Sequence, residues 1–104
     1  MSAKRKLEFK EEALQDIVAA AGWYREQQAE LDKKFLSAIK ETTDRILRHP
    51  DSGAKIYKHL RQAIVKRFPY IIIYQVTGNT IIIFQVFNSW RNPDKKRRTN
   101  KPRD

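Results

Sequence analysis

Two short isoleucine runs near the carboxyl end of the chain constrain its fold more than any other feature. Each run, Ile71–Ile73 and Ile81–Ile83, is followed by an aromatic residue, and a Gly-Asn pair lies midway between the runs. Isoleucine and aromatic side chains favour strands, and Gly-Asn suits a two-residue hairpin turn. The pattern therefore predicts an antiparallel hairpin in which Val76 faces Ile81.

The predicted hairpin is apolar on both faces. Because side chains alternate between the faces of a strand, the expected register divides them into two sets. One face carries Tyr70, Ile72, Tyr74, Val76, Ile81, Ile83 and Phe87, and the other carries Ile71, Ile73, Ile82, Phe84 and Val86. A pair of helices can cover only one face of such a sheet, so we expect the second face to bind a partner. The alternative is that the chain covers this face itself, with Tyr57, the 51–60 loop and Trp90.

The first half of the chain predicts two helices. Apolar residues recur at steps of three and four between positions 11 and 28, at Leu14, Ile17, Val18, Ala21 and Tyr24. The same period runs from Leu31 to Ile46, and the second helix should end near His49 because Pro50 cannot extend it. The connection around residues 29–30 is short, so the two helices should form an antiparallel hairpin.

Strands are expected on either side of the helices. Charged and apolar residues alternate from Arg5 to Lys10, and β-branched and aromatic residues dominate from Arg61 onward. The expected fold is α+β in the order βααβββ, with an N-terminal strand and a two-helix antiparallel hairpin packed on one face of a small, mainly antiparallel sheet. A chain of 104 residues suits one domain, expected over 1–94, followed by a basic, mobile tail at 95–104.

The composition narrows the class of partner. Lys and Arg number 22 against 12 Asp and Glu, so the formal net charge is +10, which attracts polyanions and acidic proteins. The chain has no cysteine and no apolar leader or spanning segment, which predicts a cytoplasmic protein with no membrane partner. Two separated histidines and three glycines predict neither a metal site nor a phosphate-binding loop, and we expect no cofactor.

Several segments resemble one known family. They are Trp23–Gln27, Phe35–Ile46 with the following His-Pro pair, and Arg61–Tyr70 with its Phe-Pro-Tyr strand entry. In this order they resemble the RelE/ParE superfamily of bacterial toxins from type II toxin–antitoxin (plasmid stabilisation) systems, over residues 5–94. The chain departs from the family at its closing motif, where Asn88 stands in place of a histidine that many relatives carry and Trp90 replaces a basic residue.

The resemblance implies a RelE/ParE-like fold and a toxin that a cognate acidic antitoxin holds silent in a hetero-oligomer. The antitoxin would cover the open sheet, and the residues expected to contact it are Ile71, Ile73, Phe84 and Trp90. ParE-like members inhibit DNA gyrase without hydrolysis, whereas RelE-like members cut messenger RNA on the ribosome. We favour the ParE-like action and keep two alternatives, the RelE-like one and a nucleic-acid-binding module without toxicity.

An RNA-cleaving member of this family would be a metal-independent endoribonuclease. It would need cations for the phosphate and groups that move protons. The candidate catalytic cations are Arg61, Lys66, Arg67 and Arg91, and Tyr74 or His59 could transfer a proton. The structural alternatives are that the first three keep a strand edge soluble, that Tyr74 is core and that His49 caps a helix. The residues expected to contact the target are Arg91, Lys95, Lys96 and Arg97.

Overall fold

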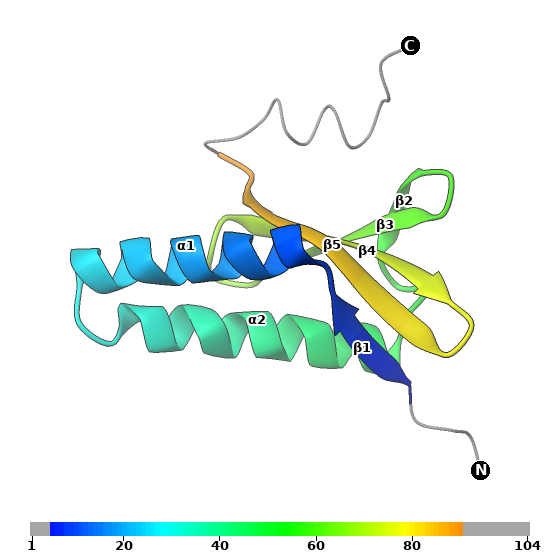
Figure 1. The fold of residues 1–104 in the computed structure, drawn as a ribbon, viewed down its shortest axis with the longest axis horizontal. Helices are drawn as coiled ribbons and strands as arrows, with labels where there is room; N and C mark the ends of the chain where they lie inside the picture. The colour runs from blue at the N-terminus through cyan, green and yellow to red at the C-terminus, as the bar shows by residue number, and fades with distance from the viewer. Residues whose placement is uncertain (1–4, 91–104) are drawn as a thin grey trace.

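The chain folds as a two-helix hairpin laid on one face of a five-stranded sheet (Figure 1). A computed structural model describes residues 5–90. The elements in chain order are β1 (Lys6–Phe9), α1 (Glu11–Gln27), α2 (Leu31–Arg48), β2 (Ala54–Tyr57), β3 (Leu60–Ile64), β4 (Tyr70–Thr77) and β5 (Thr80–Asn88). The strand order is β1-β5-β4-β3-β2, in which β1 runs parallel to β5 and the other pairs are antiparallel. The predicted fold is confirmed, and β2 is an additional edge strand within the segment expected to be a loop.

Charged residues and backbone conformation define the ends of the two helices. Glu11 and Glu12 lie in the first turn of α1, and Arg45 and Arg48 lie in the last turn of α2, so both pairs complement the helix dipole. Between the helices, Glu30 adopts the left-handed conformation with φ 76°, which reverses the chain direction in a short connection. At the far end His49 is the C-cap, and its backbone N–H donates to the Arg45 carbonyl at 2.8 Å.

The main core lies between the helices and the inner face of the sheet. Its largest buried side chains include Phe35 and Ile46 of α2, Ile72 and Tyr74 of β4, and Ile83 of β5. An aromatic cluster closes the end of this core nearest the α1–α2 connection. The rings of Tyr24, Phe35, Phe68 and Tyr70 meet in tilted or edge-to-face pairs with centroids 5.0–6.2 Å apart.

The predicted apolar stripe of α1 is wrong at two positions. Leu14 and Val18 are 47% and 71% exposed, whereas Ala13, Ala20 and Tyr24 are buried. Each helix residue is rotated about 100° from the one before it, so the helix packs through a line of side chains one position earlier than Leu14 and Val18. The consequence is a row of uncovered apolar side chains along the outside of α1.

The predicted register holds at the hairpin turn and changes further along β5. Val76 pairs with Ile81, as expected, but a β-bulge lies opposite Ile73 and Tyr74, which pair with Gln85 and Ile83. The bulge adds one residue to β5, so every later side chain changes face. Val86 therefore belongs to the inner core and Phe87 to the outer face, the reverse of the prediction.

The outer face of the sheet is partly covered by the chain itself. Ile71, Ile73 and Phe87 are at most 4% exposed there and pack against Ile56, Leu60 and Phe84. The prediction of an open apolar face is therefore only partly right, because the β2–β3 hairpin contributes to a second small core. Within residues 5–90, no helix combines the length and apolar character needed to cross a bilayer.

Candidate functional site

The first candidate surface is a groove of about 730 Å³ on the outer face of the sheet, called here the outer groove. Its apolar lining consists of Tyr57, Leu60, Ile73 and Phe84. Polar residues from the β1–α1 junction, the β2–β3 turn and the central strands complete it, namely Lys10, Glu11, Glu12, Lys58, His59, Gln75 and Gln85. An apolar floor with a mixed polar rim suits a peptide segment that buries apolar side chains.

Local geometry holds the rim of the outer groove in place. The Lys10 ammonium lies 6.0 Å from the centroid of the Phe84 ring, and the Lys58 ammonium lies 5.2 Å from that of Tyr57. Because the bulge turns Phe84 and Gln85 to the same face, the Gln85 amide can donate to the Glu12 carboxylate at 3.0 Å. The groove therefore joins the start of α1 to the middle of β5.

The β3–β4 turn carries two of the predicted catalytic cations, Lys66 and Arg67, and both are exposed. Arg67 adopts the left-handed conformation with φ 72°, and the turn closes through the Val65 N–H and the Tyr70 carbonyl at 3.0 Å. A guanidinium nitrogen of Arg67 lies 3.5 Å from the Glu41 carboxylate, and both side chains are more than 60% exposed, so this ion pair adds little stability.

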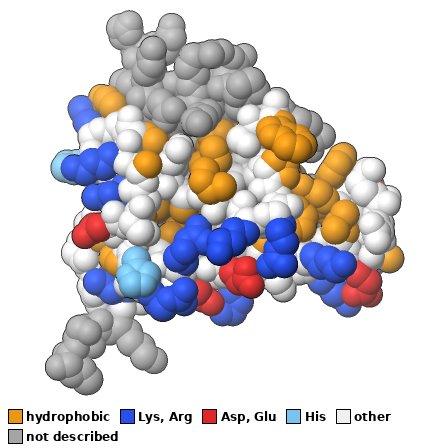
Figure 2. All heavy atoms as spheres, turned by 180° about the vertical axis from the view of Figure 1, so that it is seen from behind, with side chains coloured by type: hydrophobic (Ala, Val, Ile, Leu, Met, Phe, Trp, Pro, Cys, Tyr) orange, Lys and Arg blue, Asp and Glu red, His pale blue; other side chains and the backbone are white. Residues whose placement is uncertain are grey.

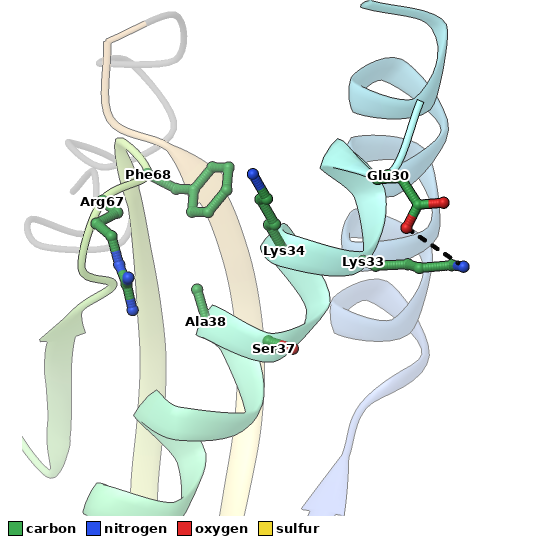
Figure 3. Close-up of a pocket in the computed structure, with 7 residues that line it drawn as sticks. All are labelled: Glu30, Lys33, Lys34, Ser37, Ala38, Arg67 and Phe68. Carbon is green, nitrogen blue, oxygen red and sulfur yellow. Dashed lines mark ion pairs between the residues drawn. The ribbon is translucent and has the colours of Figure 1, made fainter. Parts of the chain in front are cut away.

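The same turn faces α2 across a hollow of about 500 Å³ (Figure 3). Lys34 and Phe68 point toward each other across this hollow, and Arg67 lies next to Phe68. The Glu30–Lys33 ion pair lies on the opposite side of the hollow from Arg67. The face turned away from the viewer in Figure 1 carries a band of Lys and Arg side chains with hydrophobic side chains above it (Figure 2). Acidic side chains interrupt this band in Figure 2. A second hollow combines both signs of charge, since Glu41 and Asp44 line it together with Lys66.

Arg61, the third predicted cation, is used inside the fold. Its side chain is 19% exposed, and one guanidinium nitrogen donates to the carbonyls of Asp51 and Gly53 at 3.0 and 2.7 Å. The Asp51 carboxylate is 3.7 Å away but largely exposed, so the backbone contacts dominate. Arg61 thus fastens the segment between α2 and β2 to the sheet.

Tyr74 belongs to the same fastening. Its buried hydroxyl donates to the Pro50 carbonyl at 2.9 Å and accepts the Gly53 N–H at 3.1 Å. Burial raises the pKa of this phenol above its ordinary value of 10.0, although the Gly53 hydrogen bond and the Arg61 charge oppose the shift. A phenol that both donates and accepts a hydrogen bond and has a raised pKa is suited to a structural role and not to proton transfer. Tyr74 is therefore a core residue, as the structural alternative predicted.

Asn88 stands at the end of β5, where many relatives are expected to carry a histidine. It is 7% exposed, and its side-chain oxygen accepts the Trp90 N–H at 2.9 Å, a contact that closes the turn after the strand. The next residue, Ser89, donates its N–H to the Pro69 carbonyl at 2.9 Å. Trp90 itself is 79% exposed. Arg91, Lys95, Lys96 and Arg97 lie outside the described residues.

The predicted site residues are therefore distributed over three places. Phe84 and the exposed His59 meet at the outer groove, Lys66 and Arg67 lie on the β3–β4 turn, and Arg61 braces an internal segment. Ile71 and Ile73, expected to contact an antitoxin, are 4% and 0% exposed beneath the outer surface. Sequence patterns did not indicate Lys10, Lys58 or Gln85, which enter the groove through the β1–α1 junction, the β2–β3 turn and the bulge, respectively. Within residues 5–90, His, Asp and Glu form no group of three or more able to hold a metal ion.

Comparison with known proteins identifies related sequences and folds. A family model described as the ParE toxin of the type II toxin–antitoxin system parDE matches residues 7–93. Toxin ParE2 from two strains of Mycobacterium tuberculosis, CDC 1551 / Oshkosh and ATCC 25618 / H37Rv, is 26% identical over 80 residues, which is 76% of each chain.

Two solved structures share the fold at lower identity. A chain of the chromosomal ParDE system from P. aeruginosa aligns with a TM-score of 0.72 and 21% identity, over 84% of this chain and 98% of that one. A chain of the E. coli DinJ–YafQ toxin–antitoxin complex aligns with a TM-score of 0.57 and 15% identity, over 85% of this chain and 96% of that one.

Proposed function

We propose that this chain, which belongs to the ParE toxin family of type II toxin–antitoxin systems, arrests growth by inhibiting DNA gyrase and is silenced by a cognate antitoxin that occupies the outer groove. Family membership makes it the toxin component of such a system. Gyrase, as the target of ParE-like toxins, is the proposed site of action. Both the toxin and this target would then work in the cytoplasm.

The placement of the RNase candidates is the observation that supports a non-hydrolytic action. RNA cleavage requires a base, a proton donor and cations gathered around one phosphate. Here Arg61 and Tyr74 bind backbone groups of residues 50–53, whereas Lys66 and Arg67 face α2 from the β3–β4 turn. These four side chains therefore divide between two parts of the fold and do not gather around one site, so RelE-like cleavage of messenger RNA is the less favoured mechanism.

The outer groove supports an antitoxin as partner in a hetero-oligomer. Phe84 and Leu60 offer apolar surface, Lys10 and Lys58 offer positive charge, and the whole chain carries a net charge of +10. An acidic segment with apolar side chains complements both properties. Phe84 and the exposed Trp90 remain proposed contacts, while Ile71 and Ile73 would support the groove from beneath. Arg91, Lys95, Lys96 and Arg97 remain proposed target contacts on the strength of their charge.

The deciding experiment compares two activities of the purified chain in parallel. DNA supercoiling by gyrase and cleavage of messenger RNA on translating ribosomes are measured with and without the antitoxin encoded beside the toxin. Loss of supercoiling with intact messenger RNA is the expected result. Codon-positioned cleavage with normal supercoiling would overturn the gyrase proposal and establish the RelE-like mechanism.

The antitoxin-binding part of the proposal is tested with two matched substitutions. Phe84→Glu introduces a carboxylate into the outer groove, and Leu36→Glu makes the same change at a 43% exposed apolar residue of α2 that does not line the groove. We expect Phe84→Glu to weaken antitoxin binding at least about tenfold, because a buried charge would repel an acidic partner, and Leu36→Glu to leave it unchanged. Equal effects of the two variants would contradict the assignment of the groove.

A further inference from the structure

The outer side of α1 carries an apolar surface that no other part of residues 5–90 covers. Val18 is 71% exposed and Leu14 is 47% exposed, and a shallow hollow of about 340 Å³ is lined by these two residues with Glu11, Gln15 and Ala19. Farther along the same side lies Gly22, where an added Cβ would meet nothing within 4 Å. A helix surface that carries large apolar side chains next to a glycine, which leaves space for a side chain of another helix, can form one half of a helix–helix contact.

The residues on this side are arranged symmetrically about Val18. Leu14 and Gly22 are each four residues from it, and Glu11 and Arg25 are each seven residues from it. At about 100° per residue, all of these positions fall within roughly 40° of the direction of Val18. A two-fold axis at Val18 would therefore bring Leu14 of one copy to the height of Gly22 in the other, and Glu11 to the height of Arg25.

We propose that two copies of this chain associate through α1, packed antiparallel about a two-fold axis at Val18. In this arrangement Leu14 of each copy enters a hole bounded by Val18, Ala21 and Gly22 of the other, and the small residues allow the helices to approach closely. Glu11 and Arg25, both exposed, form an ion pair at each end of the contact. The interface is isologous, since each copy supplies both the knob and the hole.

Charge distinguishes a second copy from the antitoxin as the occupant. The helix Glu11–Gln27 carries four carboxylates, at positions 11, 12, 16 and 26, against one arginine, in a chain whose net charge is +10. The helix offers an acidic antitoxin no lysine, whereas in the outer groove Lys10 and Lys58 lie beside Glu11 and Glu12. A second copy instead pairs both signs of charge and keeps the basic surfaces apart. A single helix pair buries little area, so the dimer is weak and depends on protein concentration. This inference is independent of the proposed target.

Disulfide cross-linking tests the position of the two-fold axis. The chain has no cysteine, so Val18→Cys introduces a single thiol at the proposed axis, where the two Cβ atoms approach each other. Ala19→Cys is the matched control, because residue 19 is also exposed and borders the same hollow, but its Cβ points about 100° away from the proposed axis. Under mild oxidation of the purified full-length chain, Val18→Cys should form covalent dimers at least about tenfold faster than Ala19→Cys. Equal rates would overturn the proposal.

Charge reversal tests the pairing of the two ends. Glu11→Arg and Arg25→Glu should each weaken self-association about tenfold in sedimentation equilibrium, since both ion pairs become repulsive, and the double variant should restore it. Circular dichroism melts of each variant show whether the chain remains folded. A monomeric parent chain, or a double variant no better than either single one, would refute the α1 dimer. Protection of the Val18→Cys thiol only in the antitoxin complex would assign this face to the antitoxin instead.

Discussion

The stability of the fold should depend sharply on one glycine and be nearly indifferent to another. At Gly53 an added Cβ would overlap the Tyr74 hydroxyl and lie 2.7 Å from the Gln62 carbonyl oxygen, whereas at Gly22 it would meet nothing within 4 Å. Gly53 has no positive φ, so its requirement for glycine comes from the close approach and not from the backbone conformation. We therefore compare Gly53→Ala with Gly22→Ala.

The expected cost of Gly53→Ala follows from what the methyl group displaces. Overpacking of a filled site costs about 1–3 kcal/mol. The clash also breaks the two hydrogen bonds of the Tyr74 hydroxyl, at about 1 kcal/mol each, while reduced freedom of the unfolded chain returns roughly 0.4–1 kcal/mol. The sum is a loss of about 2–5 kcal/mol in the free energy of unfolding, which lowers the melting temperature by at least about 8 °C. Gly22→Ala, inside an exposed helix, should instead gain roughly 1 kcal/mol.

Urea unfolding of the isolated chain, followed by circular dichroism at low protein concentration, measures both free energies of unfolding. A third variant, Tyr74→Phe, removes the hydroxyl, so Gly53→Ala should cost less in that background than in the parent. If Gly53→Ala proved as stable as the parent, or if its cost were the same with and without the Tyr74 hydroxyl, the described packing of residues 50–53 against β4 would be wrong.

Two further predictions concern the same region and the edge of β5. Because the pKa of Tyr74 is raised in the folded chain, its neutral form contributes stability that is complete below pH 10.0 and is lost as the pH rises further; alkaline titration of the unfolding free energy should show this loss in the parent and not in Tyr74→Phe. Asp16→Ala should lower the unfolding free energy by about 1–3 kcal/mol, because the Asp16 carboxylate accepts the N–H of the buried Val86 at 3.0 Å; an unchanged urea midpoint would contradict that role.

Sequence patterns predicted the elements that carry strong, one-sided signals. The stripe of α2 from Phe35 to Ile46 is buried as expected, because its charged residues occupy the opposite side. The predicted apolar stripe of α1 was rotated about the helix axis relative to the buried face. Alanines and larger apolar residues lie on nearly every side of that helix, so the sequence does not single out the side that packs on the core. The short strand β2 was missed, since half of its four residues are exposed and it pairs on one side only.

The candidate site was less predictable than the fold. Phe84 was correctly placed on the outer face, but an all-apolar strand gives no sign of a bulge, so the exchange of Val86 and Phe87 between faces could not be foreseen. The roles of Arg61 and Tyr74 depend on backbone groups of residues 50–53, which are distant in sequence from both side chains. Residue type alone therefore suggested a catalytic role for Arg61 and Tyr74, whereas in the structure both side chains hold residues 50–53 in place.

The bulge in β5 also has a consequence for how this strand can change in length. If Gln85 were deleted, side chains 81–84 and 86–88 would alternate regularly between the faces, and Val86 and Phe87 would keep the sides they occupy now. The deletion would remove the hydrogen bond from Gln85 to Glu12 at the outer groove and would leave the core unchanged. Descendants of this chain can therefore shorten β5 by one residue at this point without repacking, which makes the bulge a place where the partner-facing surface can evolve separately from the fold.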